Sequence, residues 1–454
     1  MDPKLIGYIV FVLLVFPGFL SHLRGQVKDI RIMLSDIGSD RIIYDLGLTA
    51  YRQMPEPLLL AELHTGEEMD CSLHGRLTPG EPYASHYNPS MLLMVSGLLS
   101  KKEVLLDYCP SDTLIRVMAV TNESSRLYTF PVPPGFWKVL KQFLRHIRMA
   151  DLVDYRQQSQ CLTRLFLGAI SGELKGKSKV IIIPRERLAG FPFEILIQPD
   201  KDGTSSARRK LLVESYEIVY NNSLEQWLGS RIRNLFVKTR AGAGNSLAFA
   251  GFSPGFEYDE CIQFLPNAGS EISRIGEMFR ENGKTPLVLL CENSNENTFR
   301  QIAPFSDILH IATHSITSPE LPEMNGLLFS EFASDRENGY TDDGLLAVKD
   351  ICNMKIPAEL IVLDACASAN LRTRIGLNWF SCVDCFMKAG ARNILCTLWN
   401  VSDRFAEPFM VDFYRNYLSG MSFSKALQQV KLHMIQEPST SLPVNWAAYV
   451  LIGE

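Results

Sequence analysis

Short apolar runs alternate with amphipathic helical patterns along most of the chain after residue 91. Runs of aliphatic and β-branched residues bounded by turn-forming residues are typical of buried strands, and apolar positions that recur every three or four residues predict helices. The clearest predicted strands are residues 179–184, 307–313, 359–364 and 391–399. Further strands are expected at 211–220 and 446–452, and a helix is expected at 344–352. Strands that alternate with helices in this way predict an α/β fold with a parallel-dominated sheet and helices on both faces.

Two of the predicted strands end in side chains that can react, His314 in one and Cys366 in the other. In open α/β sheets, ligands bind just beyond the carboxyl ends of the strands. His314 and Cys366 are therefore expected to meet over one crevice, where an imidazole lowers the pKa of a thiol and produces a nucleophilic thiolate. The alternative interpretation is a hydrogen-bonded structural histidine and a small buried cysteine.

Composition restricts the class of protein without identifying the chemistry. The chain has 454 residues, of which 46% are hydrophobic and 21% are charged, as in ordinary globular proteins. The net charge of −5 gives no basic surplus for nucleic-acid binding. The 10 cysteines lack the spacings of a zinc site, and Cys382-Val-Asp-Cys385 lies inside an apolar helical pattern. We expect free, buried thiols of a reducing compartment, with no metal and no organic cofactor.

The N-terminus carries an apolar segment over residues 5–20, with Lys4 before it and Arg24 after it. It is short for a bilayer span, which needs about 20 residues, and close to the length of a signal-peptide core. A signal anchor, a cleaved signal peptide and a buried helix are the competing interpretations. The favoured expectation is a membrane-associated protein anchored through residues 5–20 and otherwise cytoplasmic.

With these patterns laid out, the chain resembles the CHAT family of caspase-like cysteine peptidases, which is related to separases and metacaspases. The resemblance rests on stretches in the family's order: Lys179–Phe193, Leu265–Ile272, His310–His314, Leu363–Cys366, Ala389–Asp403 and Trp446–Gly453. It implies a caspase-like core preceded by a smaller, divergent α/β region. The expected regions are a hydrophobic segment (1–26), a helical or irregular leader (27–90), the divergent front part (91–240) and the catalytic core (241–454).

The resemblance also implies roles for individual residues. Cys366 would be the nucleophile and His314 the general base, while His310 would be structural. The backbone N–H groups of Ser315 and Cys366 would hold the oxyanion of the tetrahedral intermediate. The family normally has glycine after the catalytic histidine, so Ser315 is a departure, and it would be strained if that position required φ > 0. Loss of one oxyanion donor costs about 10²–10³ in rate, which leaves a slow enzyme or a pseudoenzyme as alternatives.

Two acids are candidates for substrate binding. Asp364 stands two residues before Cys366, so strand alternation puts both on one side of the sheet. Metacaspases have an acid at the matching place that receives a basic P1 side chain. Asp403 belongs to a stretch that resembles the separase segment whose acid binds P1 arginine. The structural alternatives are a carboxylate satisfied by backbone N–H groups for Asp364 and a helix cap for Asp403.

The sequence therefore predicts a cysteine endopeptidase that cleaves protein or peptide substrates after a basic residue, arginine before lysine. A regulatory partner or self-cleavage would activate it, since the family is often controlled in this way. The alternative is a catalytically weak or inactive caspase-like module that binds partners. A small-ligand sensor is less well supported, because the chain has no glycine-rich phosphate-binding loop.

Overall fold

A computed structural model describes the chain over residues 87–150, 155–198, 210–237, 247–255, 265, 267–316, 325–330, 344–367 and 377–454. The apolar segment at residues 5–20 and nearly all of the leader lie outside these ranges. Among the helices of the described residues, none has the length and apolar character that crossing a membrane requires.

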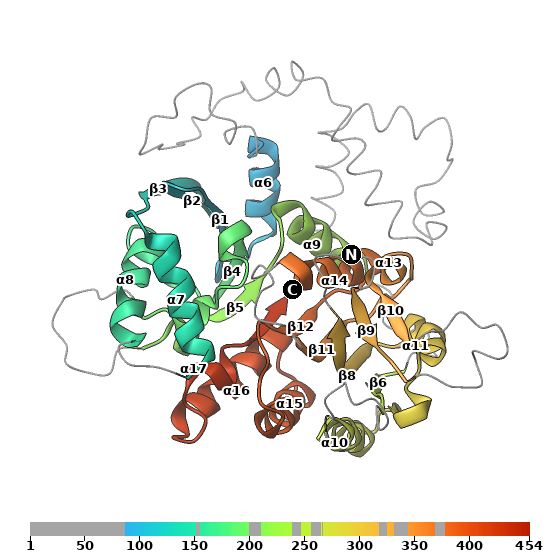
Figure 1. Cartoon of the computed structure of the whole chain (residues 1–454). Helices are drawn as coiled ribbons and strands as arrows, with labels where there is room; N and C mark the ends of the chain where they lie inside the picture. Colours follow the sequence, from blue (N-terminus) through green and yellow to red (C-terminus); the bar gives the residue numbers. More distant parts are fainter. Residues whose placement is uncertain are drawn as a thin grey trace, which may run out of the picture. The chain divides into compact units, whose positions relative to one another are not determined.

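Thirteen strands of the described residues join one sheet (Figure 1). The strands are β1 (Glu103–Pro110), β2 (Leu114–Val120), β3 (Ser125–Pro131), β4 (Lys179–Pro184), β5 (Glu217–Tyr220), β6 (Phe249–Ser253), β7 (Pro286–Leu290), β8 (Ile308–Ile316), β9 (Gly326–Leu328), β10 (Leu345–Ala347), β11 (Leu360–Ala367), β12 (Ile394–Thr397) and β13 (Tyr449–Ile452). Their order is β10-β9-β8-β11-β12-β13-β5-β4-β1-β2-β3, and β6 pairs with both β8 and β7.

The sheet contains two parallel blocks. In the rear block, β7, β6, β8, β11 and β12 are parallel. In the front block, β13, β5, β4 and β1 are parallel. The blocks run in opposite directions, because β12 and β13 are antiparallel. Strands from both sides of the predicted boundary near residue 240 thus share one sheet, and the domain boundaries themselves stay predictions.

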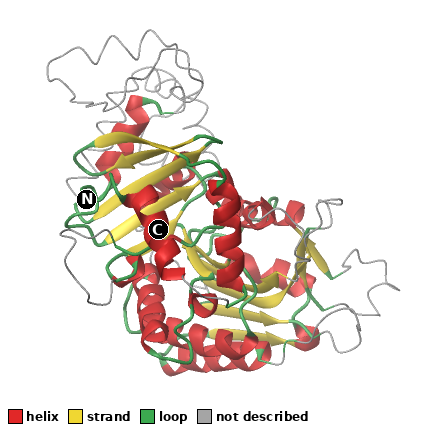
Figure 2. Ribbon diagram, turned by 60° about the vertical axis from the view of Figure 1, so that its left-hand side comes forward, coloured by secondary structure: helices red, strands yellow, loops and turns green. Residues whose placement is uncertain are grey.

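Helices cover both faces of this sheet (Figure 2). They are α6 (Pro89–Leu98), α7 (Phe136–Arg148), α8 (Tyr155–Leu167), α9 (Leu224–Val237), α10 (Ala268–Glu281), α11 (Glu296–Ile302), α13 (Val348–Ile351), α14 (Leu377–Ala389), α15 (Asp403–Leu418), α16 (Phe423–Gln436) and α17 (Pro443–Trp446). On the rear block, α10 and α15 lie on one face, and α13 and α14 lie on the other (Figure 1).

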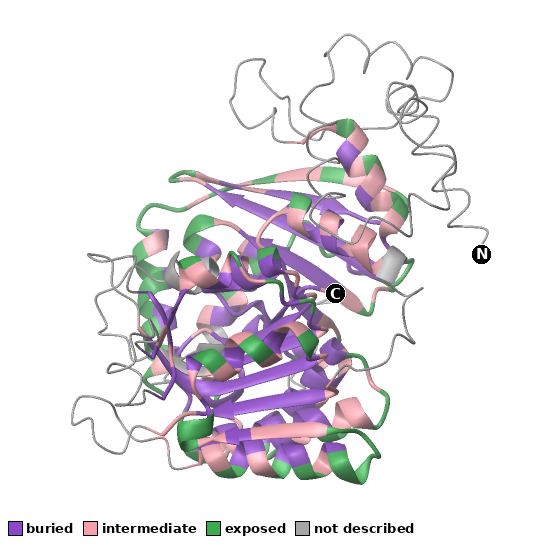
Figure 3. Ribbon diagram, turned by 90° about the vertical axis from the view of Figure 1, so that its right-hand side faces the viewer, coloured by how far each residue is buried: buried purple, intermediate pink, exposed green. Residues whose placement is uncertain are grey.

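The parallel strands are buried on both faces, which explains their nearly continuous apolar runs. Figure 3 shows the inner strands buried, while β3 and β7 at the edges are partly exposed and the helices expose their outer sides. The burial pattern of β4 is typical, since every residue after Lys179 is buried. The α/β class with a mostly parallel sheet and helices on both faces, predicted from the sequence, is confirmed.

Small residues let α10 approach the rear block closely. A Cβ added at Gly251 of β6 would lie 2.5 Å from Ile272 of α10, and one added at Gly276 of α10 would lie 2.5 Å from Val288 of β7. Ala312 of β8 packs in the same small cluster, together with Ala268 and Ile272. The position of α10 over β6, β7 and β8 is therefore fixed by sterics, and this matters for the site below.

Several local predictions were wrong. Residues 344–352 were expected to be a helix, but they form the short strand β10 and then α13. Residues 446–452 were expected to be one strand, but Trp446 ends α17 and β13 begins at Tyr449. Of the strand expected at 211–220, Leu212–Glu214 form a 3₁₀ turn and Glu217–Tyr220 form β5. These segments are short, so tertiary pairing decides their conformation and local periodicity does not.

The expectation of free thiols is wrong for one pair. Cys352, at the end of α13, forms a disulfide with Cys385 of α14, with their Cα atoms 4.3 Å apart. The two helices pack against each other and bring the cysteines together. The two cysteines are 33 residues apart in the sequence, and this separation alone does not predict that they pair. Free cysteines of the described residues include Cys109, Cys161, Cys291, Cys382 and Cys396.

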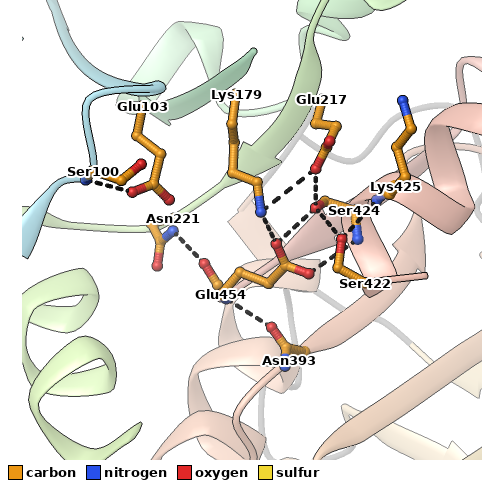
Figure 4. A network of polar contacts seen from close by, with 11 residues as sticks. Ser100, Glu103, Lys179, Glu217, Asn221, Asn393, Ser422, Ser424, Lys425 and Glu454 are labelled. Atoms are coloured by element: carbon orange, nitrogen blue, oxygen red, sulfur yellow. Dashed lines mark hydrogen bonds and ion pairs between the residues drawn. The ribbon is translucent and has the colours of Figure 1, made fainter. Parts of the chain in front are cut away.

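A polar network joins the end of the chain to the front block (Figure 4). The side chain of Glu454 accepts hydrogen bonds from Lys179 of β4 and from the backbone N–H of Ser424, the latter at 3.0 Å. Glu217 of β5 lies 3.6 Å from Lys179 and also contacts the hydroxyl of Ser424. Asn393 accepts a hydrogen bond of 2.7 Å from the N–H of Glu454. These contacts fix β13 and α16 against β4 and β5.

Candidate functional site

The strands β8 and β11 are parallel neighbours, and His314 and Cys366 are directly paired in their register. Neighbouring strands lie about 4.8 Å apart, and alternate residues share a face of the sheet. The backbone therefore places positions 314 and 366 side by side on one face. His314 is buried, with 4% of its surface exposed. The sequence predicted that the two strands bring these residues together, and the register places positions 314 and 366 directly beside each other.

The edge of β8 changes its partner just before the histidine. β6 pairs with residues 309–311 of β8, and β9 pairs with Ser315 and Ile316. On the other edge, β11 stays paired through Ala367. Both strands thus continue beyond the His314–Cys366 pair. The pair lies inside the sheet, near its carboxyl edge, and not at free strand ends.

Ser315 adopts an ordinary strand conformation. It pairs with Leu327 of β9 on one side and with Ala367 of β11 on the other, and its side chain is buried. Among the described non-glycine residues, the positive φ angles occur at Ala150, Glu186, Cys291 and Glu454, so Ser315 has none. The backbone at this position does not require glycine, and the feared strain of a serine is absent.

Asp364 lies beside two residues that were not predicted to join it. Its carboxylate, the His310 ring and the carboxylate of Glu271 each offer a polar atom within 4.8 Å of the others. The Nε2 atom of His310 is 2.9 Å from Oε1 of Glu271. Residues 310, 312 and 314 of β8 and residues 364 and 366 of β11 share a face by strand alternation. The polar cluster therefore lies next to the His314–Cys366 pair, beneath α10.

The His310 side chain is completely buried. Burial lowers its pKa to about 4, although the nearby charge of Asp364 acts in the opposite direction. The imidazole is therefore neutral at pH 7, and its contact with Glu271 is not an ion pair at that pH. The ring of Tyr414 on α15 stacks on His310 with a centroid distance of 5.7 Å. His310 is structural in the sense predicted, since it lies inside the core.

Glu271 was missed as a member of the site. The sequence pattern places Glu271 near the start of a helix, and it also carries a signal of a buried polar site. Glu271, Ile275 and Phe279 follow each other at four-residue spacing and are all buried on α10. An acid on the apolar stripe of an amphipathic helix is rare unless it is paired inside the protein, so this position marked a buried polar site.

Asp403 is the first residue of α15, and Ser402 occupies the N-cap position. The helix follows β12, which is the neighbour of β11. Asp403 thus follows the strand next to the one that carries Cys366, as expected from the sequence. The N-cap is Ser402, so the capping alternative for Asp403 is not met, although the helix dipole favours a carboxylate in the first turn.

The buried free thiols of Cys382 and Cys396 have pKa values far above that of a reactive thiol. Burial raises the pKa of Cys382 and of Cys396 to about 12. A thiol with such a pKa stays protonated at neutral pH and is a poor nucleophile. These two cysteines are core residues, as the sequence predicted for Cys382.

Known proteins resemble parts of this chain. Human tetratricopeptide repeat protein 28 is 31% identical over 145 residues, and the mouse protein is 32% identical over 110 residues. These segments are 31% and 24% of this chain but only 6% and 4% of the relatives, so the chain spans a small part of their length.

Two crystal structures of the separase–securin complex from Saccharomyces cerevisiae are similar over 80% of this chain, with TM-scores of 0.48 and 0.49 and 10% sequence identity. The matched region is 31% and 30% of those chains. The sequence profile of the CHAT domain matches residues 156–454, which is more than half of the chain and includes β4 to β13. The chain belongs to the CHAT domain family.

Proposed function

We propose that this protein is a cysteine endopeptidase in which Cys366 is the nucleophile and His314 the general base. The observation that carries the proposal is the register pairing of these two residues on adjacent parallel strands. Membership of the CHAT domain family is consistent with it. An imidazole next to a thiol is the arrangement that generates a thiolate at neutral pH.

The reaction follows from these positions. Nε2 or Nδ1 of His314 takes the proton of the Cys366 thiol, and the thiolate attacks the carbonyl carbon of the scissile peptide bond. Backbone N–H groups at Ser315 and Cys366 stabilise the oxyanion. The imidazolium then protonates the leaving amine, and the C–N bond breaks. Water, deprotonated by His314, hydrolyses the acyl-enzyme and releases the second product.

The proposed substrate is a peptide with arginine, or second lysine, at P1. A carboxylate pairs with guanidinium through two parallel hydrogen bonds, which favours arginine over lysine. Asp403 is the acid that we favour, since it follows the strand next to β11. Asp364 is the second candidate, although the polar cluster with His310 and Glu271 already engages it.

The burial of His314 supports control of this activity. Only 4% of the residue is exposed, and both β8 and β11 continue past the reactive pair. A peptide must reach the sulfur, so access to this pair requires a change at the carboxyl edge of β8 and β11. A regulatory protein partner or self-cleavage would supply this change.

Peptide cleavage measured with and without Cys366 tests the proposal. The full chain is assayed on a fluorogenic peptide panel with P1 varied, before and after limited proteolysis. We expect cleavage after arginine, its loss in Cys366→Ala and in His314→Ala, and its retention in Cys382→Ala. An arginine chloromethylketone should label the wild type and not Cys366→Ala. Activity that survives in Cys366→Ala would refute the mechanism, and faster cleavage after aspartate would refute the role of the acids.

The alternative function is a caspase-like module that binds partners without cleaving them. The same burial of His314 favours it, because an inaccessible dyad has no catalytic use. Under this alternative, partner capture is equal for wild type and Cys366→Ala, and no chloromethylketone labelling occurs under any condition. Labelling after limited proteolysis would decide in favour of the peptidase.

A further inference from the structure

We propose that Glu271, His310 and Asp364 form a binding site for one divalent transition-metal cation, such as Zn²⁺. The three ligands come from three elements: α10, β8 and β11. The site lies on the face of the sheet that α10 covers, next to positions 314 and 366. It is a separate site from the reactive pair, and the proposal does not require peptidase activity.

The first support is the choice and spacing of donor atoms. One imidazole nitrogen and two carboxylate oxygens lie within 4.8 Å of one another. Zinc binds histidine nitrogen at about 2.0–2.1 Å and carboxylate oxygen at about 2.0–2.2 Å. Two such ligands at the tetrahedral angle are roughly 3.3 Å apart. Nε2 of His310 and Oε1 of Glu271 are 2.9 Å apart, which is within about 0.5 Å of this separation.

The second support is the state of His310. The residue is completely buried, and within the described part of the chain neither ring nitrogen forms a hydrogen bond. The 2.9 Å contact with Glu271 is short, but it lacks the angles of a hydrogen bond. Buried polar groups almost always have a partner, and an ion or a water is the usual explanation when the protein supplies none. A cation in front of Nε2 would be that partner.

The third support is the rigidity of the surroundings. Gly251, Gly276 and Ala312 allow α10 to lie directly against the sheet, so the position of Glu271 relative to β8 is sterically fixed. The ring of Tyr414 stacks on His310 and restrains its orientation. Ligands held in place before the ion arrives lose little conformational entropy on binding, which favours a preformed site.

Charge agrees with a cation. The set combines an imidazole, which coordinates metals in its neutral form, with up to two negative charges in a buried place. Imidazole and carboxylate ligands together suit Zn²⁺ and similar first-row ions, whereas Ca²⁺ and Mg²⁺ prefer sets made of oxygen alone. Three protein ligands leave a further coordination position for water.

A bound ion would connect α10 to the two strands that carry His314 and Cys366. Binding to the folded state alone stabilises that state by mass action. The expected consequence is a protein whose thermal stability rises with Zn²⁺ and whose strands β8 and β11 keep their register more firmly. Metal binding would then support the geometry of the reactive pair without taking part in its chemistry.

The test uses the full chain after removal of metal with a chelator. Zn²⁺ is titrated in competition with a chromophoric chelator, and Co²⁺ is titrated while its visible absorption is recorded. We expect one tight equivalent, bound by nitrogen and oxygen ligands, and a rise in the unfolding temperature with Zn²⁺. Affinity should fall at least about 10-fold in Glu271→Gln and in Asp364→Asn.

Two controls keep the outcome decisive. Glu277→Gln lies on the exposed side of the same helix and should bind as the wild type does. Cys366→Ala should also bind normally, which separates this proposal from the proposed peptidase. Absence of a tight equivalent would overturn the proposal, as would unchanged affinity in Glu271→Gln. So would a thiolate-to-cobalt absorption band, since that places the metal on cysteine. If Glu271→Gln does not fold, Asp364→Asn and the wild-type cobalt spectrum decide.

Discussion

Both parallel blocks of the sheet contain a polar cluster around a strand carboxylate, but the partners differ. In the front block, Asp107 of β1 is fully buried and receives two hydrogen bonds from Arg185, at 2.7 and 2.6 Å. In the rear block, Asp364 of β11 lies near Glu271 and His310. A guanidinium always carries its charge, whereas the buried imidazole is neutral at pH 7. The front cluster therefore contains its own cation, whereas the proposed Zn²⁺ would supply one in the rear cluster.

The pKa values of Asp107 and of Arg185 in the front cluster are both raised. Burial raises the pKa of Asp107, and Arg185 only partly offsets this. The pKa of Arg185 is raised by the same carboxylate in spite of burial. Two short bonds to a guanidinium indicate that the carboxylate is ionised at neutral pH. The pair is thus a compensated buried ion pair, whose loss on one side leaves a buried charge.

Removing Arg185, the cation of the front cluster, should cause the largest loss of stability among these substitutions. In Arg185→Ala the buried carboxylate of Asp107 loses its counter-charge, which costs about 3–5 kcal/mol of the free energy of unfolding. Chemical denaturation followed by circular dichroism measures this. Arg185→Lys keeps the charge but not the paired geometry, and should fall between wild type and Arg185→Ala. A loss below 1 kcal/mol in Arg185→Ala would mean that Asp107 finds another partner or takes up a proton.

The network at Glu454 should show a smaller, pH-dependent effect. Burial alone would raise the pKa of Glu454, but the charge of Lys179 and hydrogen bonds from Lys179 and Ser424 outweigh it, so the pKa is lowered. A lowered carboxyl pKa contributes stability that is complete above the unfolded value and disappears as the pH falls through the folded value. Glu454→Gln should cost about 1–2 kcal/mol at pH 7.

The difference between Glu454→Gln and wild type should shrink when unfolding is measured at successively lower pH, below the ordinary glutamate pKa. Lys179→Met should show the same trend, because it removes the charge that lowers the pKa. A difference that stays constant with pH would assign the loss to packing and not to the ionised carboxylate.

In the absence of metal, a substitution in the rear cluster should lower the stability of the fold only slightly. Glu271→Gln keeps the shape of the side chain and removes one charge beside a neutral imidazole, so the loss should be about 1 kcal/mol or less. Thermal unfolding of chelator-treated protein measures it. A loss as large as that of Arg185→Ala would contradict the comparison, since it would show that the rear cluster is already charge-compensated.

An exposed ion pair gives the lower limit of the series. Arg415 and Asp412 pair on the surface of α15, with 58% and 28% of their side chains exposed. Arg415→Ala should change the free energy of unfolding by less than about 1 kcal/mol, because solvent and salt screen such pairs. The same denaturation experiment measures it, and raising the salt concentration should remove most of the difference.

The long buried strands and the side-by-side position of residues 314 and 366 were predicted well from the sequence, because each strand carries a strong local signal. The strand at residues 179–184 was predicted at the observed bounds of β4, and positions 314 and 366 lie in register. Short elements such as β10 were not predicted, since three residues give no periodicity. The rear polar cluster was not predicted either, because Glu271 reaches His310 and Asp364 only after α10 has packed on the sheet.

The antiparallel contact between β12 and β13 determines the rim of the sheet at which each block has its carboxyl strand ends. Because the blocks point in opposite directions, the carboxyl ends of β8 and β11 open on one rim of the sheet, and those of β1 and β4 open on the opposite rim. A strand of five or six residues separates the rims by about 17–20 Å. The two carboxyl rims are therefore far enough apart that a small molecule docked on one rim does not cover the other.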